Sequence, residues 1–477
     1  MKIGLVDSAF FALQDTILKE GHELHLYVEE ASNPSLATSS TKSEKERFFT
    51  YPSLPAFLKA IPTFDLVVTD GGFVTSANLS SYQWARAHGI PAIGYETNLI
   101  ALEQFRDIAF QIVRETSPIS DIKLPEAMEF FDIESLTKFL RKIKKSWVLK
   151  KGEGAPTEDI GPRTIVIHPH TINSVLPFIT NSPNSWFDKN GKGGARLEEF
   201  ISGHEWSFAV FYDGTNISQV AYAYKEYKGA QNGDRGGVQT GEVGTLLQWE
   251  ILEEHSPIYQ FFSKIVSHPA LKGKFHGMID INTIVNEDFS HAHLIEFTPR
   301  WGRPSLDVML GAISNPAKGN FCSLLLAAAS GNLKTFPLTG YKEALQLGKT
   351  SVGVTLFDYG NPFVLCVQKG EKFEPVLKEP RQIKKLPKGD FCRTVPIFGF
   401  YDNDNKTWKT IMDPIEGSSR HFVTVGCHKN GEVARDAAYK ALASFEEFGI
   451  TWRDDIGKSE HLTEMVKVIS HFLKGEK

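Results

Sequence analysis

The sequence predicts a mixed α/β protein of several domains that begins with a Rossmann-like unit. Short apolar strands alternate with helical patterns through the first hundred residues, and longer strands with glycine-rich loops follow in the middle of the chain. The length of 477 residues corresponds to about three domains of roughly 150 residues each. Because strands and helices alternate, we expect a parallel sheet whose sites lie at the carboxyl ends of the strands.

The first hundred residues support the Rossmann-like unit element by element. Short apolar runs typical of strands occur at residues 2–6, 23–28, 64–69 and 89–94. Between the first two runs, apolar side chains recur at helical spacing, at Phe10, Leu13, Ile17 and Leu18. Gly21 stands where that helix would end, and a second helix is expected around residues 80–87. Residues 31–45 are rich in Ser and Thr, so we expect a loop there.

Charge and cysteine content argue against several classes of protein. The 52 basic and 57 acidic side chains leave a net charge of −5, which argues against duplex nucleic acid or an anionic membrane as a partner. No apolar run approaches the roughly 20 residues that cross a bilayer. The first six residues lack the apolar core of a signal peptide. The four cysteines form no CxxC pair, which favours free thiols in a reducing compartment, and we expect a cytoplasmic protein.

A lysine at the end of a strand is the first candidate for binding phosphate. Residues 147–150 form an apolar strand that runs into a small-residue loop at residues 151–154. Lys150 would supply a point charge, and the glycines of the loop would let backbone N–H groups approach a nucleotide phosphate. A solvated lysine at a strand end is the alternative that this pattern leaves open.

Two acidic residues in the middle of the chain are candidates for holding a metal ion. Asp280 lies in the segment 277–282 and Glu296 in the segment 294–302, and the apolar neighbours of each point to the opposite face of a strand. Magnesium prefers oxygen ligands and takes one or two protein carboxylates where it bridges nucleotide phosphates. Either acid alone could be a hydrogen-bonded structural carboxylate, but the two together with a nearby lysine favour a metal site.

Four segments, in their order along the chain, resemble the ATP-grasp ligases, and among these the phosphoribosylamine–glycine ligase family. They are residues 197–205, 234–244, 294–302 and 421–457. The resemblance extends over most of the chain, from the stretch at residues 102–115 to residue 457. It implies an α/β protein with an ATP-grasp fold, an N-terminal Rossmann-like (pre-ATP-grasp) domain and a C-terminal β-rich domain.

The same resemblance divides the chain into three parts. Residues 1–100 would form the N-terminal Rossmann-like substrate domain. Residues 101–335 would form the ATP-grasp domain, in which about residues 125–200 make a small lid subdomain. Residues 336–477 would form the C-terminal α+β domain.

The resemblance also implies which residues bind ATP. Glu198, Glu199 and Phe200 would form the hinge that receives adenine, largely through backbone groups. Glu205, seven residues after Glu198, is similar to the acid that hydrogen-bonds the ribose. These four residues would therefore surround the nucleoside.

Four further residues would act on the phosphates and the metal. Lys150 resembles the strand lysine that contacts the phosphates, and Arg106 stands where a second lysine is usual, which keeps the charge but changes its geometry. Glu296 resembles the principal Mg²⁺ ligand, and Asp280 occupies the place where the wider superfamily often has a second acid. The implied cofactors are ATP with Mg²⁺ or Mn²⁺.

Arg300 and Asp234 resemble residues that hold the carboxylate substrate and the acyl phosphate. In the implied reaction, ATP phosphorylates a carboxylate, and an amine then displaces phosphate to leave an amide, ADP and phosphate. Catalysis would come from positioning and charge neutralisation, with no nucleophilic Ser or Cys. We expect glycine as the activated amino acid, small-molecule substrates as the partners, and a monomer or homodimer.

Several segments depart from the family pattern. The loop expected to receive the sugar phosphate is replaced by residues 7–10 (DSAF), and a second substrate loop is replaced by residues 70–73 (DGGF). Carboxylates repel phosphate at short range, so we expect an amine other than phosphoribosylamine, with a modified nucleotide or base as one candidate. Thr298 stands where an asparagine metal ligand is usual, and the glycine-rich loop after Lys150 is shortened.

Three alternatives stay open at this point. The protein could be a true phosphoribosylamine–glycine ligase of purine synthesis. It could be a catalytically degenerate protein that only binds nucleotide, which Thr298 and the shortened loop would explain. An ATP-dependent carboxylase would need a biotin or bicarbonate site that the sequence does not reveal.

Overall fold

The structure is a computed structural model that describes most of the chain in separate segments. The described residues are 1–6, 11–28, 42–69, 75–96, 102–103, 106–116, 121–150, 164–181, 194–229, 232–233, 242–302, 304–313, 317, 319–358, 366–369, 372–375, 381–383, 386–387, 389–396, 399–402, 407–410, 420–443, 445 and 450–476. Within these segments no helix has both the length and the apolar character needed to span a membrane.

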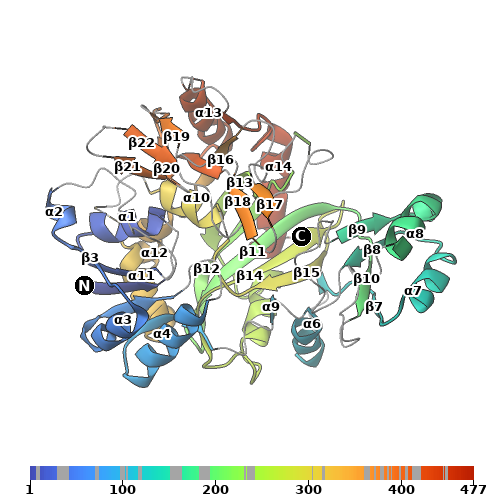
Figure 1. Ribbon diagram of the computed structural model, residues 1–477, viewed down its shortest axis with the longest axis horizontal. Coiled ribbons are helices and arrows are strands. Elements are labelled where there is room, and N and C mark those ends of the chain that lie inside the picture. Colours follow the sequence, from blue (N-terminus) through green and yellow to red (C-terminus); the bar gives the residue numbers. More distant parts are fainter. Residues whose placement is uncertain are drawn as a thin grey trace.

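The amino-terminal elements form a parallel sheet flanked by helices (Figure 1). The elements are β1 (Lys2–Val6), α1 (Phe11–Lys19), β2 (Glu23–Tyr27), α2 (Lys42–Lys45), β3 (Phe48–Thr50), α3 (Leu54–Ala60), a 3₁₀ turn (Ile61–Thr63), β4 (Leu66–Val68), α4 (Ser76–Ala87) and β5 (Ala92–Tyr95). The strands lie in the order β3-β2-β1-β4-β5, and every neighbouring pair is parallel. This order confirms the predicted Rossmann-like unit.

Local sequence explains the first helix and its end. The apolar stripe of α1 buries Leu13, Ile17 and Leu18 against the sheet. Gly21 follows the helix with φ of +90°, a conformation that side chains with a Cβ rarely adopt. The expected loop at residues 31–45 is wrong at its end, because Lys42–Lys45 forms the single turn α2. That turn consists of charged helix formers and one serine, without glycine or proline, and the preceding part of the expected loop lies outside the described residues.

The middle of the chain adds antiparallel strands to this sheet. Its elements are α6 (Arg106–Glu115), β6 (Ile122–Lys123), β7 (Ala127–Phe130), α7 (Ile133–Leu140), β8 (Trp147–Lys150), β9 (Thr164–Ile167), a 3₁₀ turn (Pro169–Thr171), α8 (Ile172–Asn181), β10 (Ala195–Glu199), β11 (His204–Tyr212), β12 (Ile217–Glu226), β13 (Gly244–Ile251), α9 (Pro257–Ile265), β14 (Phe275–Val285), β15 (Ala292–Thr298), α10 (Ser305–Gly311), α11 (Phe321–Ala329), a 3₁₀ turn (Leu333–Thr335) and α12 (Leu338–Leu345). β14 pairs antiparallel with β5, which joins the amino-terminal strands to the central ones. Figure 1 shows the central strands between the amino-terminal elements at one end and β7–β10 at the other.

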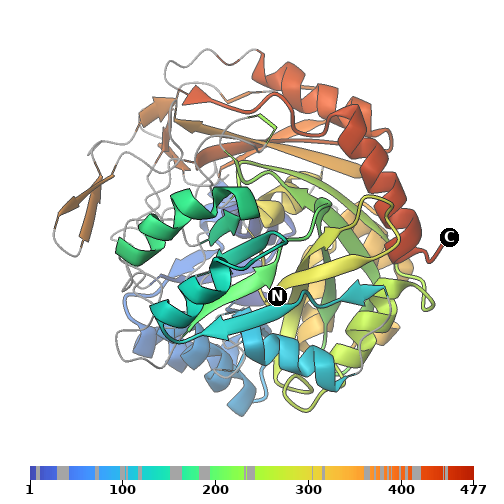
Figure 2. The same cartoon turned by 90° about the vertical axis from the view of Figure 1, so that its right-hand side faces the viewer.

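Four of the described strands form a separate small sheet in the order β7-β10-β8-β9. Helices α7 and α8 cover it, and the sheet and helices share a core of their own, made by Leu136, Leu140, Trp147, Leu149, Ile167, Ile179, Ala195 and Leu197. In Figure 2 these teal and green elements lie in front of the curved large sheet. This small sheet and its helices fall within residues 125–200, the range expected for the lid subdomain, and the lid and the domain boundaries stay predictions.

The carboxyl-terminal part extends the large sheet at its other edge. Its elements are β16 (Thr350–Asp358), β17 (Cys366–Lys369), β18 (Lys372–Pro375), β19 (Arg381–Ile383), β20 (Cys392–Pro396), β21 (Gly399–Asp402), β22 (Thr407–Thr410), β23 (Arg420–His428), α13 (Gly431–Leu442), β24 (Ile450–Thr451), α14 (Ser459–Val468) and a π-helical turn (Ile469–Leu473). The described strands of the large sheet run β20-β23-β16-β13-β12-β11-β14-β5-β4-β1-β2-β3, with β15 beside β14. One sheet therefore passes through all three predicted domains.

Helix α13 packs closely on β23. Ala434, Ala438 and Ala441 on its inner face are fully buried, whereas Val433 is 38% exposed. A Cβ at Gly426 of β23 would lie 1.9 Å from the carbonyl oxygen of Ala434, so no larger residue fits there. Small residues on both elements let the helix approach the strand.

Candidate active site

One face of the large sheet is polar over part of its length. Directly paired residues on neighbouring strands point to the same face, and Ser207 pairs with both Tyr224 and Asn282 while Asn282 pairs with Glu296. Alternation along the strands then places seven side chains on this face, namely Glu205, Ser207, Tyr224, Glu226, Asp280, Asn282 and Glu296. The intervening Trp206, Phe208 and Ile281 lie in the core behind the sheet.

Asp280 is the most deeply buried acid on this face. It is 1% exposed, and its Oδ2 accepts a hydrogen bond from the hydroxyl of Tyr224. Its Oδ1 is buried and has no hydrogen-bond partner among the described residues. Burial raises the pKa of Asp280 well above its ordinary value, and Glu226 and Glu296 raise it further against the hydrogen bond from Tyr224. A buried oxygen without a partner is costly unless something binds it.

Glu296 is held beside Asp280 by a chain of hydrogen bonds. Its Oε1 accepts from Asn282 Nδ2 at 2.9 Å, and Asn282 Oδ1 accepts from the Ser207 hydroxyl at 2.8 Å. Asp280 itself pairs with Thr298 across β14 and β15. The structure thus brings the two acids expected to bind metal onto one face of two neighbouring strands, and all of their donor atoms are the oxygens that Mg²⁺ prefers.

A lysine and two acids that sequence reasoning missed lie close to this pair. Lys228 Nζ is 2.5 Å from Glu205 Oε1 and 3.0 Å from Glu226 Oε2. Glu242 is buried, accepts a hydrogen bond from Thr245, and has a pKa raised well above its ordinary value by burial and then by Glu226. Glu226 could have been found from the period-two alternation of β12, which carries Tyr224 and Glu226 on one face; no local pattern indicated Lys228 or Glu242.

The small sheet holds a second group of predicted residues. Lys150 and Arg196 are paired across β8 and β10, and both bind the carboxylate of Glu198. The Arg196 Nε donates to Glu198 Oε1 at 2.7 Å, and Lys150 forms an ion pair with Oε2. Lys150 is 8% exposed and Glu198 is 4% exposed. Lys150 is therefore a buried, paired lysine here, which differs from the solvated lysine of the alternative interpretation.

Glu199 and Phe200 lie at the end of β10, where the expected adenine hinge would be. The carboxylate of Glu199 accepts from Lys145 Nζ at 2.8 Å, and the backbone N–H of Phe200 donates to the carbonyl of Ser146 at 3.2 Å. The Phe200 ring is 39% exposed and meets His168 edge-on, with 5.7 Å between the ring centroids. An exposed aromatic ring at this position offers an apolar surface for a base.

Arg300 binds a carboxylate of the protein itself. Its Nε lies 3.0 Å from both carboxylate oxygens of Glu103, and its Nη2 lies 2.5 Å from Oε1. About a quarter of each side chain is exposed, at 26% for Arg300 and 29% for Glu103. Arg300 also acts on Asp280, whose pKa it lowers. The guanidinium is thus oriented for a carboxylate near the two acids, and Glu103 occupies that position in this structure.

Some predicted residues lie outside what the structure describes. Asp234 is one of them, and so are the loop after Lys150 and the departures at residues 7–10 and 70–73. Arg106 is the first residue of α6, but its side chain is also outside the description.

This geometry belongs to an ATP-grasp fold. Residues 114–306 match the family model described as the phosphoribosylglycinamide synthetase ATP-grasp (A) domain. The solved structure of phosphoribosylamine–glycine ligase from Thermotoga maritima superimposes with a TM-score of 0.64, covering 95% of this chain and all of that chain at 19% identity. A biotin carboxylase from Campylobacter jejuni superimposes with a TM-score of 0.58 over 97% of this chain and 95% of its own, at 15% identity.

The resemblance is also found in the amino-acid sequences of relatives. The chain is 28% identical over 275 residues to the chloroplastic phosphoribosylamine–glycine ligase of Arabidopsis thaliana, and 24% identical over 277 residues to the phosphoribosylamine–glycine ligase of Neisseria meningitidis. Each alignment covers 56% of this chain and 46% or 58% of the relative. The chain therefore spans about half the length of the curated relatives that it matches. The protein resembles phosphoribosylamine–glycine ligase within the ATP-grasp superfamily, as its motifs predict.

Proposed function

We propose that this protein is an ATP-dependent carboxylate–amine ligase. The observation that carries the proposal is the polar face. There the Oδ1 of Asp280, which has no partner in the part of the chain that the structure describes, lies beside Glu296, and the carboxylate-binding Arg300 is close by. The match of residues 114–306 to an ATP-grasp domain of a ligase supports the same activity. Glycine is the expected carboxylate donor, since the relatives by name act on glycine.

The residues present fit a magnesium ion. Asp280 and Glu296 would hold it through carboxylate oxygens, and the buried Oδ1 of Asp280 would gain the partner that it lacks among the described residues. Bound there, Mg²⁺ would neutralise charge on the phosphates of ATP and on the phosphoryl group that is transferred. Thr298, buried opposite Asp280, supplies a hydroxyl at the place where an amide ligand is usual.

Arg300, which is partly exposed, and the buried Lys150 would bind the substrates by exchange of partners. Arg300 would release Glu103 and take the carboxylate of the amino acid in the same bidentate geometry. Lys150 would turn from Glu198 to a phosphate of ATP, while Arg196 keeps Glu198 paired. Both steps replace one anion by another, so neither leaves a buried charge without a partner.

The reaction then consists of two displacements. A carboxylate oxygen of the amino acid attacks the γ-phosphorus, and the bond from that phosphorus to the bridging oxygen of ADP breaks. The amine nitrogen next attacks the acyl carbon, the carbon–oxygen bond to phosphate breaks, and the nitrogen loses a proton. The chain contributes orientation and charge complementarity to both steps.

The acceptor is proposed to be an amine other than phosphoribosylamine. The basis is the replacement of the expected sugar-phosphate loop and of the second substrate loop by segments 7–10 and 70–73, each of which contains an aspartate. Phosphoribosylamine is the competing candidate, favoured by the names of the relatives. An amine of a modified nucleotide or base is one candidate for the acceptor.

The test is phosphate release from Mg·ATP with a panel of amino acids, with and without phosphoribosylamine generated in the assay. We expect glycine-dependent release that is indifferent to phosphoribosylamine and rises with the correct amine. Release that requires phosphoribosylamine would establish the competing acceptor.

Glu296→Ala should abolish release while its thermal unfolding matches wild type, and unchanged release by this variant would contradict the metal assignment. Nucleotide binding without any release would favour a binding protein.

A further inference from the structure

Lys228 places an ammonium group among the acids of the polar face. Its Nζ contacts Glu205 at 2.5 Å and Glu226 at 3.0 Å. Burial alone would lower the pKa of Lys228, but Glu226, Glu205 and Glu296 together raise it well above its ordinary value. The group is therefore a permanent cation, and it acts on Glu296, a proposed metal ligand, and on Glu205, the proposed ribose ligand.

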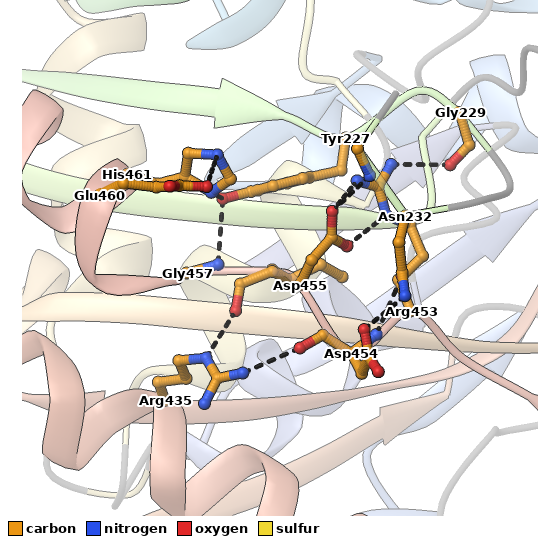
Figure 3. A network of polar contacts seen from close by, with 12 residues as sticks. Tyr227, Gly229, Asn232, Arg435, Arg453, Asp454, Asp455, Gly457, Glu460 and His461 are labelled. Carbon is orange, nitrogen blue, oxygen red and sulfur yellow. Dashed lines mark hydrogen bonds and ion pairs between the residues drawn. The ribbon is translucent and has the colours of Figure 1, made fainter. Parts of the chain in front are cut away.

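Both neighbours of Lys228 are bound by the carboxyl-terminal segment, Tyr227 through its side chain and Gly229 through its backbone (Figure 3). The Tyr227 hydroxyl accepts from the backbone N–H of Gly457 at 3.0 Å and pairs with His461 Nδ1 at 2.8 Å. The carbonyl of Gly229 accepts from Arg453 Nη1 at 2.8 Å. The two neighbours of Lys228 are thus tied to residues more than 220 positions later in the sequence.

Arg453 is itself locked by a buried ion pair. Its Nε and Nη2 donate to the two oxygens of Asp455 at 2.7 and 2.6 Å, and the side chains are 1% and 3% exposed. The guanidinium also lies over the Tyr227 ring, 5.1 Å from its centroid. Asp455 accepts in addition from the backbone N–H of Gly233 at 2.7 Å. Removing one partner of such a pair leaves an uncompensated buried charge, so the pair stays intact. It therefore holds Arg453, and with it the backbone at Gly229 beside Lys228, in one position.

We propose that Lys228 is a cation of the nucleotide and metal site, and that Arg453 and Asp455 are positioning residues that hold it there. This inference rests on the proposed function, because Glu205 and Glu296 are the acids assigned to ATP and metal. When no ligand is bound, the ammonium group of Lys228 offsets the negative charge of Glu205 and Glu296. It therefore competes with a divalent cation but favours the polyanionic phosphates of ATP.

Two opposite changes in affinity test the role of Lys228. Lys228→Met keeps the length of the side chain and removes its charge. We expect Mn²⁺ alone, measured by electron paramagnetic resonance, to bind at least about threefold more tightly to this variant, because the acids lose a competing cation. The non-hydrolysable analogue AMPPNP with Mg²⁺, measured by calorimetry, should bind about tenfold more weakly, because the phosphates lose a nearby positive charge.

Asp455→Asn tests the positioning residues. This variant keeps the shape of the side chain but removes the charge that orients Arg453, and it should change both affinities in the same directions by smaller factors. In the double variant with Lys228→Met, Asp455→Asn should add nothing, because its effect passes through Lys228. Asp436→Asn on α13, whose side chain is 79% exposed, is the matched control and should leave both affinities unchanged. If Asp455→Asn does not fold, Tyr227→Phe, which removes only the hydroxyl bound to Gly457 and His461, replaces it.

The outcomes separate this inference from the proposed function. A wild-type protein that does not bind AMPPNP would overturn the proposed function, and the Mn²⁺ titrations would still decide the role of Lys228. If both affinities fall together in Lys228→Met, or neither changes, Lys228 has only a structural role and the inference is overturned. Additive effects in the double variant would overturn the positioning role of Asp455.

Discussion

At the scale of single residues, the proposed site consists of charges that are held by partners within the protein, and we propose that substrates replace these partners. Arg300 and Lys150 each bind a carboxylate of the protein, at Glu103 and Glu198, in positions where substrate anions are proposed to bind. Asp280 lacks a partner for one buried oxygen among the described residues. Such arrangements do not maximise stability, and they are typical of binding sites for ions.

Replacing Asp280 should increase the stability of the metal-free protein and weaken the binding of the metal ion. We expect Asp280→Asn to raise the free energy of unfolding of the metal-free protein by about 1–2 kcal/mol, because it removes a buried carboxylate that has acidic neighbours. The same variant should lose the stabilisation that Mg²⁺ with AMPPNP gives to the wild type. Denaturant unfolding with and without these ligands measures both effects. A variant that is less stable than wild type and is still stabilised by the ligands would contradict the assignment.

Lys150→Ala tests the phosphate role of the buried lysine. We expect ATP affinity to fall about tenfold, equivalent to about 1.4 kcal/mol, because a point charge is lost while Arg196 keeps Glu198 paired. Calorimetric titration with AMPPNP measures the change. The exposed neighbour Lys144 provides the control as Lys144→Ala, which should bind as wild type does. Equal affinities in all three proteins would remove Lys150 from the site.

At the scale of elements, the contact between α4 and β14 joins the amino-terminal unit to the central strands. The Tyr82 hydroxyl lies 2.8 Å from Nδ1 of His276, and both side chains are buried. Burial, helped by Arg86, lowers the pKa of His276 to about 4. The neutral imidazole is therefore part of the folded junction.

Acid should weaken this junction. His276 is protonated near pH 6.5 in the unfolded state but only near pH 4 in the folded state. The contribution of the neutral imidazole to the free energy of unfolding is therefore fully present above pH 6.5 and is lost as the pH falls from 6.5 to 4. At pH 5 this group alone should reduce the free energy of unfolding by about 2 kcal/mol relative to pH 7. We expect His276→Gln to lose that part of the pH dependence in urea unfolding, while His88→Gln, at an exposed site, keeps it. An unchanged pH dependence in His276→Gln would contradict the role of the histidine.

Sequence patterns predicted the elements better than the contacts between them. The apolar alternation of β14 and β15 indicates which side chains share a face, so Asp280 and Glu296 could be predicted together from the sequence. The ion pair of Glu103 with Arg300 spans 197 residues, and the hydrogen bond of Arg453 to Gly229 spans 224. The periodicity of apolar residues along the chain does not indicate such contacts, because they depend on how the whole sheet is assembled. Lys228 was missed for this reason.

At the scale of the whole molecule, one large sheet connects the predicted domains. Strands from the amino-terminal, central and carboxyl-terminal parts of the chain all belong to this sheet, and the central strands lie between the other two groups. In Figure 2 the small sheet lies in front of the large one. Lys150 and Glu198 belong to the small sheet, whereas Asp280 and Glu296 belong to the large one, so the proposed ATP site draws on both.

The most direct test of the proposed ligase is to follow the oxygen of the activated carboxylate. Turnover with ¹⁸O-labelled glycine, Mg·ATP and an accepted amine should transfer one labelled oxygen to each phosphate released, detected by mass spectrometry. That result follows because the carboxylate oxygen stays on phosphorus when the amine displaces phosphate. Phosphate released during amide formation without the label would contradict activation of the carboxylate by ATP.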